Sequence, residues 1–157
     1  MKFLVVKNLK HDQHFKPILT GLLLFILFYI PSDFYVKAHS LGVTQNTLQS
    51  TLFGNDEEYL DPMQTSVFLE NWHVEIFFMM MILLTLSAVF IRLSNHIKFD
   101  SYITHLTMIC AFSSLLSLAG CFFLYPKLSF IYLGTFYLWH IGALYMVVTS
   151  LKRLYVN

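Results

Sequence analysis

Four apolar segments, each about 20 residues long, constrain the fold of this chain more than any other feature. They cover residues 17–36, 71–91, 102–125 and 130–151. An α-helix rises about 1.5 Å per residue, so roughly 20 residues cross the 30 Å hydrocarbon core of a bilayer. With 57% hydrophobic and 12% charged residues, the chain has too little polar surface to cover a soluble globule. The sequence predicts a single-domain, all-α integral membrane protein, residues 1–157, with four transmembrane helices in an antiparallel bundle.

Charged residues are distributed unevenly between the two sides of this predicted bundle. Eight of the ten basic residues fall on the side of the two termini: Lys2, Lys7, Lys10, Lys16, Arg92, Lys98, Lys152 and Arg153. Seven of the nine acidic residues fall at or beyond the other boundary: Asp33, Asp56, Glu57, Glu58, Asp61, Glu70 and Glu75. The positive-inside rule therefore predicts that both termini are cytoplasmic. The simplest location is the inner (cytoplasmic) membrane of a bacterium, and the basic side gives no indication of nucleic-acid binding.

The first apolar segment also allows a second interpretation, a cleaved signal peptide. It has a basic start and an apolar run, and Val36, Lys37 and Ala38 resemble a small-residue cleavage site. The long polar start, together with Pro31 and Asp33 before that site, favours a retained helix. Whether the first span is retained stays open.

The external loop, residues 37–64, is the longest polar stretch. Residues 44–53 are predicted to form a short helix that ends at Gly54 and lies on the bilayer surface. Asp61 and Pro62 have the residue types of an N-cap and a first helical position, so we expect the second long helix to begin there.

Small residues form a stripe along one face of the third span. Thr107, Cys110, Ser114, Ser117 and Cys121 recur at spacings of three and four, and Thr135, Gly142 and Thr149 repeat every seven residues in the fourth span. In lipid, such stripes let helix backbones approach closely. The stripe predicts packing within one bundle, or contact with a partner or a second copy through Cys110, Ser114, Ser117 and Cys121. The two cysteines lie about 16 Å apart along one helix, which excludes a disulfide between them.

The sequence lacks the motifs of common enzyme classes. It contains no C-x-x-C, G-x-x-x-x-G-K-[ST], G-x-S-x-G or H-E-x-x-H motif. A non-enzymatic membrane component is therefore the leading expectation, and any function has to be sought among ionisable residues at membrane depth.

Histidine and carboxylate residues gather near the predicted external boundary. Asp33 lies at the end of the first span and His39 just after it, and Glu70, His73 and Glu75 lie at the entrance to the second. Mixed imidazole and carboxylate ligands suit divalent transition metals. These residues are candidate metal ligands, and the leading hypothesis is that this face handles a cation or docks a partner. The alternative is a solvated interface.

Haem or quinone binding is the second functional hypothesis. Imidazole is a common axial ligand of haem, so His140 and His105 are candidate ligands of haem b in a membrane subunit of an electron-transfer complex. Counted along the helices, the two residues differ in depth by about 10 Å, which disfavours a shared haem.

A third hypothesis joins titratable groups at different depths. Glu75, His140 and His105, with Tyr137 and Tyr145, form a discontinuous ladder across the membrane, as in a proton or ion pathway. Its steps of about 7 to 10 Å are longer than a hydrogen bond and would need intervening water.

Overall fold

The computed structural model describes residues 15–94 and 96–155, apart from the side chain at position 58. The α-helices are α1 (Phe15–Ser40), α2 (Gln45–Phe53), α3 (Thr65–Arg92), α4 (Ile97–Phe123) and α5 (Ser129–Tyr155), with short 3-10 turns η1 (Asp56–Glu58) and η2 (Pro126–Leu128). Helices α1, α3 and α4, and α5 together with η2, are long and apolar enough to cross a membrane. The described part of the chain contains no β-strand, which confirms the predicted all-α bundle of four long helices.

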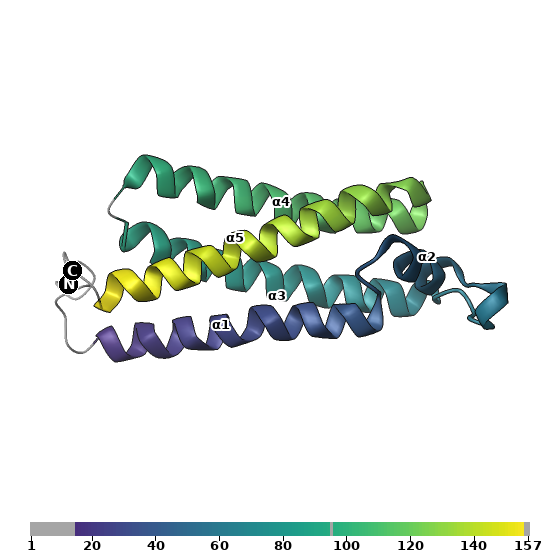
Figure 1. Cartoon of the computed structure of the whole chain (residues 1–157), viewed down its shortest axis with the longest axis horizontal. Coiled ribbons are helices and arrows are strands. Elements are labelled where there is room, and N and C mark those ends of the chain that lie inside the picture. The colour runs from purple at the N-terminus through teal and green to yellow at the C-terminus, as the bar shows by residue number, and fades with distance from the viewer. Residues whose placement is uncertain (1–14, 95, 156–157) are drawn as a thin grey trace.

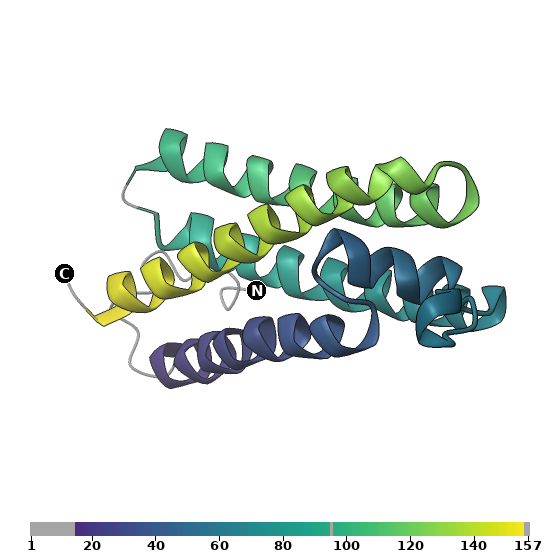
Figure 2. The same cartoon turned by 45° about the vertical axis from the view of Figure 1, so that its right-hand side comes forward.

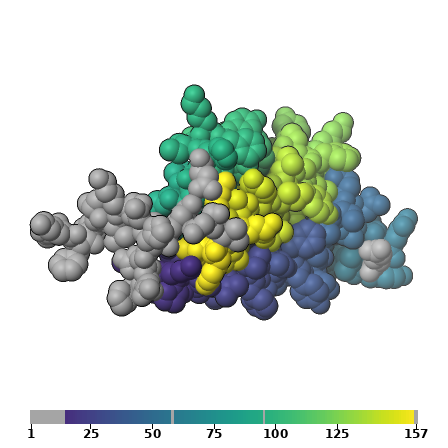
Figure 3. Space-filling model, turned by 60° about the vertical axis from the view of Figure 1, so that its left-hand side comes forward, coloured from purple at the N-terminus to yellow at the C-terminus, as the bar shows by residue number. Residues whose placement is uncertain are grey.

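The four long helices run alternately up and down, and α5 lies between α1 and α4 (Figure 1). Helix α5 contacts each of the other four α-helices. Helix α2 packs across one end of the bundle, where α1 ends and α3 begins (Figure 2). We call this the α2 end. At the opposite end, the last turns of α5 lie between the starts of α1 and α4 (Figure 3), and the hydroxyls of Thr20 and Tyr155 are 2.8 Å apart.

Buried apolar side chains form two clusters. The larger one runs along α1, α3, α4 and α5. The smaller one lies beneath α2, where Leu48 and Leu52 pack with Phe68, Tyr132 and Phe136. The outward faces of the long helices also carry many exposed large hydrophobic side chains. In water such surfaces would favour aggregation, whereas in a bilayer they meet lipid.

The helix boundaries correct the sequence-based expectations for the loop. Helix α3 begins at Thr65 with Gln64 as its N-cap, so the predicted start at Asp61 and Pro62 is wrong. Leu60 pairs with Asn55 through backbone hydrogen bonds of 2.9 and 3.0 Å, and the chain is still extended at Gln64, with a ψ of 139°. Proline also disfavours the helical conformation at the residue before it, here Asp61.

Helix α1 continues to Ser40, four residues past the predicted end of the first span. A short helix does form in the loop. Thr44 caps α2 at its start, and Gly54, with a φ of 83°, ends it. Its position on the bilayer surface stays a prediction.

The small-residue stripe of α4 packs within the chain. All five of its residues are buried. A Cβ built on Gly142 of α5 would come 2.3 Å from Oγ1 of Thr107, so the two helix backbones approach closely at this point. Cys110 and Cys121 are free thiols, as predicted. The residues considered for contact with a partner are therefore covered by helices of the same chain.

The orientation of the bundle in the membrane stays a prediction. Three of the basic residues on which it depends, Lys2, Lys7 and Lys10, lie outside the described residues.

Candidate functional site

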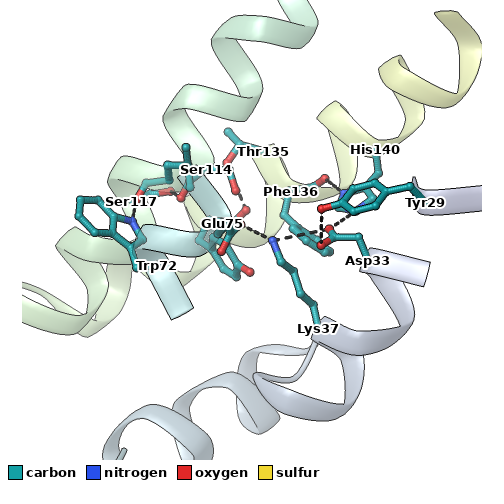
Figure 4. A network of polar contacts seen from close by, with 12 residues as sticks. Tyr29, Asp33, Lys37, Trp72, Glu75, Ser114, Ser117, Thr135, Phe136 and His140 are labelled. Carbon is teal, nitrogen blue, oxygen red and sulfur yellow. Dashed lines mark hydrogen bonds and ion pairs between the residues drawn. The ribbon is translucent and has the colours of Figure 1, made fainter. Parts of the chain in front are cut away.

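Four ionisable side chains from three helices meet inside the bundle near its α2 end (Figure 4). Asp33 and Lys37 come from α1, Glu75 from α3 and His140 from α5. We call them the polar cluster. Lys37 and His140 expose 7% and 4% of their surface, and the side chains of Asp33 and Glu75 expose 16% and 10%. Ionisable groups are rarely buried this deeply in an apolar bundle unless they pair with one another.

The Lys37 ammonium group is held between two carboxylates. It donates a hydrogen bond to Oε1 of Glu75 and lies 3.6 Å from Oδ2 of Asp33. Asp33 and Lys37 are four residues apart and therefore share one face of α1. The same ammonium lies 5.4 Å from the centre of the Phe136 ring, a cation–π contact. This arrangement satisfies a buried lysine and links α1 to α3.

The two nitrogens of His140 face different acceptors. Nδ1 lies 2.8 Å from the backbone oxygen of Phe136. A carbonyl oxygen accepts and cannot donate, so Nδ1 carries a hydrogen. Nε2 lies 3.3 Å from Oδ2 of Asp33. A neutral imidazole has no second hydrogen, so a hydrogen bond at this contact requires one further proton, either on Nε2 or on the carboxyl group.

The formal charge of the polar cluster depends on the same proton. With two carboxylates, one ammonium and a neutral imidazole, the net charge is −1, and one further proton brings it to zero. An uncompensated charge is costly in an apolar interior, so burial favours the neutral form.

Aromatic rings surround the His140 imidazole. The ring centre lies 3.8 Å from that of Trp139, 4.2 Å from Phe136 and 5.7 Å from Phe34. These rings separate the imidazole from lipid and water, and aromatic faces stabilise a nearby cation. The Tyr29 hydroxyl lies beside the polar cluster, 3.5 Å from Oδ1 of Asp33.

The remaining helices add no charged group to the cluster. Helix α2 contains no charged residue. The charged residues of α4, Lys98 and Asp100, lie in its first turn, at the opposite end of the bundle.

The cluster lies at membrane depth. Counted along the helices at about 1.5 Å per residue, Asp33, Glu75 and His140 are roughly 10 to 17 Å from the α2 end. The long helices measure about 40 Å against a hydrocarbon core of about 30 Å. In a bundle centred on the hydrocarbon core, these three residues fall within the apolar layer, nearer to the α2 side, and Lys37, three residues before the end of α1, begins near its boundary.

The predicted metal ligands do not come together. His39 is exposed, with Nδ1 2.9 Å from the backbone oxygen of Tyr35, and Glu70 and His73 are also exposed. Glu75 is separate from them in the polar cluster. Across residues 15–94 and 96–155, no group of three or more His, Cys, Asp or Glu side chains is close enough to hold a metal ion. Metal binding by His39, Glu70, His73 and Glu75 stays a prediction.

The two candidate haem ligands also lie apart. His105 is exposed on the third turn of α4, and its Nδ1 is 2.8 Å from the backbone oxygen of Ser101. His140 belongs to the polar cluster. Of the predicted ladder, Glu75 and His140 meet through Lys37 and Asp33, whereas His105 does not join them.

Lys37 is the cluster residue for which the sequence suggested no site, whereas Asp33 was a candidate for the external cation site. Both were placed at the external boundary, because the apolar run ends at residue 36. The spacing of residues in α1 could have indicated that Asp33 and Lys37 share its buried face. The buried positions of α1 include Leu23, Ile26, Ile30 and Lys37, and Asp33 completes a stripe with spacings of three and four.

A second buried ion pair lies at the opposite end of the bundle. The Arg153 guanidinium donates two hydrogen bonds, of 2.6 and 3.0 Å, to the fully buried Asp100 carboxylate. The Ser94 hydroxyl donates to the same carboxylate, and the guanidinium lies 5.2 Å from the Phe90 ring. This bidentate pair fixes the end of α5 to the start of α4.

Comparison with known protein families identifies the class of the chain. The family model Aq_1264_TM, described as a transmembrane helical domain, matches residues 42–157. The chain belongs to this family. It is accordingly a multi-pass membrane protein in contact with the lipid bilayer. The matched residues include Glu75 and His140, whereas α1, with Asp33 and Lys37, precedes them. No curated protein and no solved structure matches the chain.

Proposed function

We propose that this membrane protein handles protons by binding and releasing one proton per chain at the polar cluster. The observation that carries the proposal is the contact between Nε2 of His140 and Oδ2 of Asp33. Nδ1 already donates to a carbonyl oxygen, so this contact is a hydrogen bond only when one more proton is present. Without that proton, Nε2 and Oδ2 are both hydrogen-bond acceptors and repel each other.

The chemistry of the cluster favours a proton over a metal ion. The Lys37 ammonium occupies the space between the Asp33 and Glu75 carboxylates, where a metal ion would have to bind, and its charge repels a second cation. A proton needs no such space, because it resides on the imidazole or on the carboxyl group. The cation handled by this protein is thus a proton.

Proton release has a mechanical consequence. The Asp33–His140 contact joins α1 to α5, so its loss weakens the attachment of α1 near the α2 end. Proton binding is therefore coupled to the position of α1, which is how a titratable cluster in a membrane protein transmits a change in protonation.

The other functions predicted from the sequence have less support. Haem ligation would require Nε2 of His140 to leave Asp33 or Nδ1 to leave its carbonyl partner. Partner docking at the exposed His39, Glu70 and His73 remains compatible with proton handling. From the charge distribution, we also propose a bacterial inner-membrane location with cytoplasmic termini, so that the cluster lies nearer to the external side.

Trp139 provides a reporter for the test. The chain has two tryptophans, and Trp72→Phe leaves Trp139, whose ring lies 3.8 Å from that of His140. A protonated imidazole accepts an electron from excited indole and quenches its fluorescence. Fluorescence of Trp72→Phe protein in lipid nanodiscs would be recorded between about pH 3 and 9, which spans ordinary carboxyl and imidazole titrations.

The expected result is a reversible, single-step loss of fluorescence as the pH falls. It should disappear when His140→Gln is added and persist when the exposed His105→Gln is added as a matched control. Fluorescence that does not depend on pH, or that depends on it equally in the His140→Gln protein, would overturn the proposal.

A further inference from the structure

We infer that α2 and the turn before it form a lid that limits the rate at which the proton exchanges with the polar cluster, and that the hydrogen bond from the Tyr137 hydroxyl to the Val43 backbone oxygen is its latch. This inference rests on the proposed function and names the regulation of the same site. The latch hydrogen bond is 2.9 Å long and joins the turn before α2 to α5.

Helix α2 covers the α2 side of the cluster. Its inward residues Leu48 and Leu52 are fully buried and belong to the apolar cluster that contains Tyr132 and Phe136. Phe136 supplies both the carbonyl that accepts from His140 and the ring beneath Lys37. Lifting α2 would therefore open the protein directly above the cluster.

The path from the opposite end is longer and apolar. It leads through a core of fully buried residues, among them Leu86, Phe90, Met146 and Val147. Water entering from the α2 end has roughly 10 to 17 Å to cross, out of a bundle of about 40 Å. The lid therefore lies on the shorter of the two routes.

The lid is joined to the cluster by a turn that can act as a hinge. The backbone amides of Leu41 and Gly42 both donate to the backbone oxygen of Lys37, at 3.0 Å each. Gly42 has a φ of 86°, a conformation that favours glycine, and a Cβ at this position would meet Thr47 at 2.4 Å. Movement of the lid is thus transmitted directly to the last turn of α1, which carries Lys37.

The latch also lies close to the imidazole. Tyr137 and His140 are three residues apart on α5. The Tyr137 ring lies 5.9 Å from Phe34, whose ring lies 5.7 Å from His140. A second polar contact, from Nε2 of Gln45 to Oγ of Ser129, holds the start of α2 to the start of α5. The capping box of Thr44 and Thr47 keeps α2 helical, so it can move as one unit.

The test compares exchange rates between two matched variants. Tyr137→Phe removes the latch hydroxyl and keeps the ring. Tyr145→Phe is the control, because both tyrosines are on α5 and expose similar fractions, 39% and 42%. In the Trp72→Phe background, stopped-flow pH jumps would follow Trp139 fluorescence. A neutral hydrogen bond is worth enough to change the opening equilibrium by about two- to tenfold.

We expect Tyr137→Phe to respond about two- to tenfold faster than the parent, with the same fluorescence at each final pH, and Tyr145→Phe to match the parent. Hydrogen exchange of the α2 amides should rise by a similar factor in Tyr137→Phe. Equal rates in all three proteins would overturn the lid while leaving the proposed function intact. If the fluorescence of the parent protein does not change with pH, the proposed function is overturned. In that case, hydrogen exchange of the α2 amides that is the same in Tyr137→Phe as in the parent would independently overturn the lid.

Discussion

Replacing Lys37 with methionine tests whether the polar cluster depends on its buried ammonium group. Methionine keeps an unbranched apolar side chain of similar length but removes the charge. The Asp33 and Glu75 carboxylates would lose their shared partner while remaining largely buried. The formal charge of the cluster with a neutral imidazole would change from −1 to −2.

The expected loss of stability follows from this charge. Breaking a buried ion pair by removing one partner costs about 3 to 5 kcal/mol, because the remaining charge stays buried and uncompensated. The double variant Lys37→Met, Glu75→Gln removes one of the stranded carboxylates, so it should regain about 1 to 2 kcal/mol of the loss.

Equilibrium unfolding in mixed detergent micelles, followed by helical circular dichroism, would measure these free energies. Lys152→Met is the matched control, because Lys152 lies exposed near the end of α5. It should change the free energy of unfolding by no more than about 0.5 kcal/mol. If Lys37→Met is no more destabilising than Lys152→Met, the cluster does not depend on its ammonium and the charge argument is refuted.

Three further predictions concern packing, the second ion pair and topology. Gly142→Ala should lower the free energy of unfolding by about 1 to 3 kcal/mol, because the new methyl group would clash with Thr107. Gly134→Ala is its control and should be neutral or stabilising, because a Cβ there has no atom within 4 Å. Equal effects of the two substitutions would contradict the close approach of α4 and α5. Arg153→Met should lower the free energy of unfolding by about 3 to 5 kcal/mol in the same assay, because it leaves the buried Asp100 carboxylate without its partner. A loss as small as that of Lys152→Met would contradict the pairing. A reporter fused to the carboxyl terminus should be cytoplasmic and one inserted in the loop that carries α2 should be external, and the reverse pattern would refute the predicted orientation.

The four long helices could be predicted from the sequence because bilayer thickness sets the length of an apolar span. The start of α3 could not. Pro62 suits a first helical position, but the chain pairs Asn55 with Leu60 and is still extended at Gln64, so the helix begins at Thr65. That pairing depends on a turn conformation with Tyr59 at a φ of 53°, which hydropathy does not reveal.

The polar cluster was only half predictable, for a physical reason. Glu75 and His140 lie inside apolar runs. Burial was expected for His140, whereas Glu75 was placed at the external boundary. Lys37 ended the first run when residues were counted by hydropathy, and Asp33 was placed at its external boundary, because a single charge is costly in lipid. Paired charges cost less, so the buried face of α1 continues through them. The residues that Asp33 and Lys37 contact on other helices depend on how each helix is rotated about its axis. A single sequence does not determine this rotation.

Nuclear magnetic resonance of the imidazole and carboxyl groups would test the central claim most directly. The protein would carry ¹⁵N-histidine and ¹³C-aspartate labels in lipid bilayers, with His140→Gln and Asp33→Asn assigning the signals. Spectra between about pH 4 and 9 would report the protonation of each ring nitrogen and of the carboxyl group. We predict that Nδ1 of His140 carries a hydrogen throughout, and that one proton is gained between Nε2 and the Asp33 carboxyl group as the pH falls. A His140 imidazole and an Asp33 carboxylate that both keep one protonation state across this range, in a bundle that stays folded, would contradict the account.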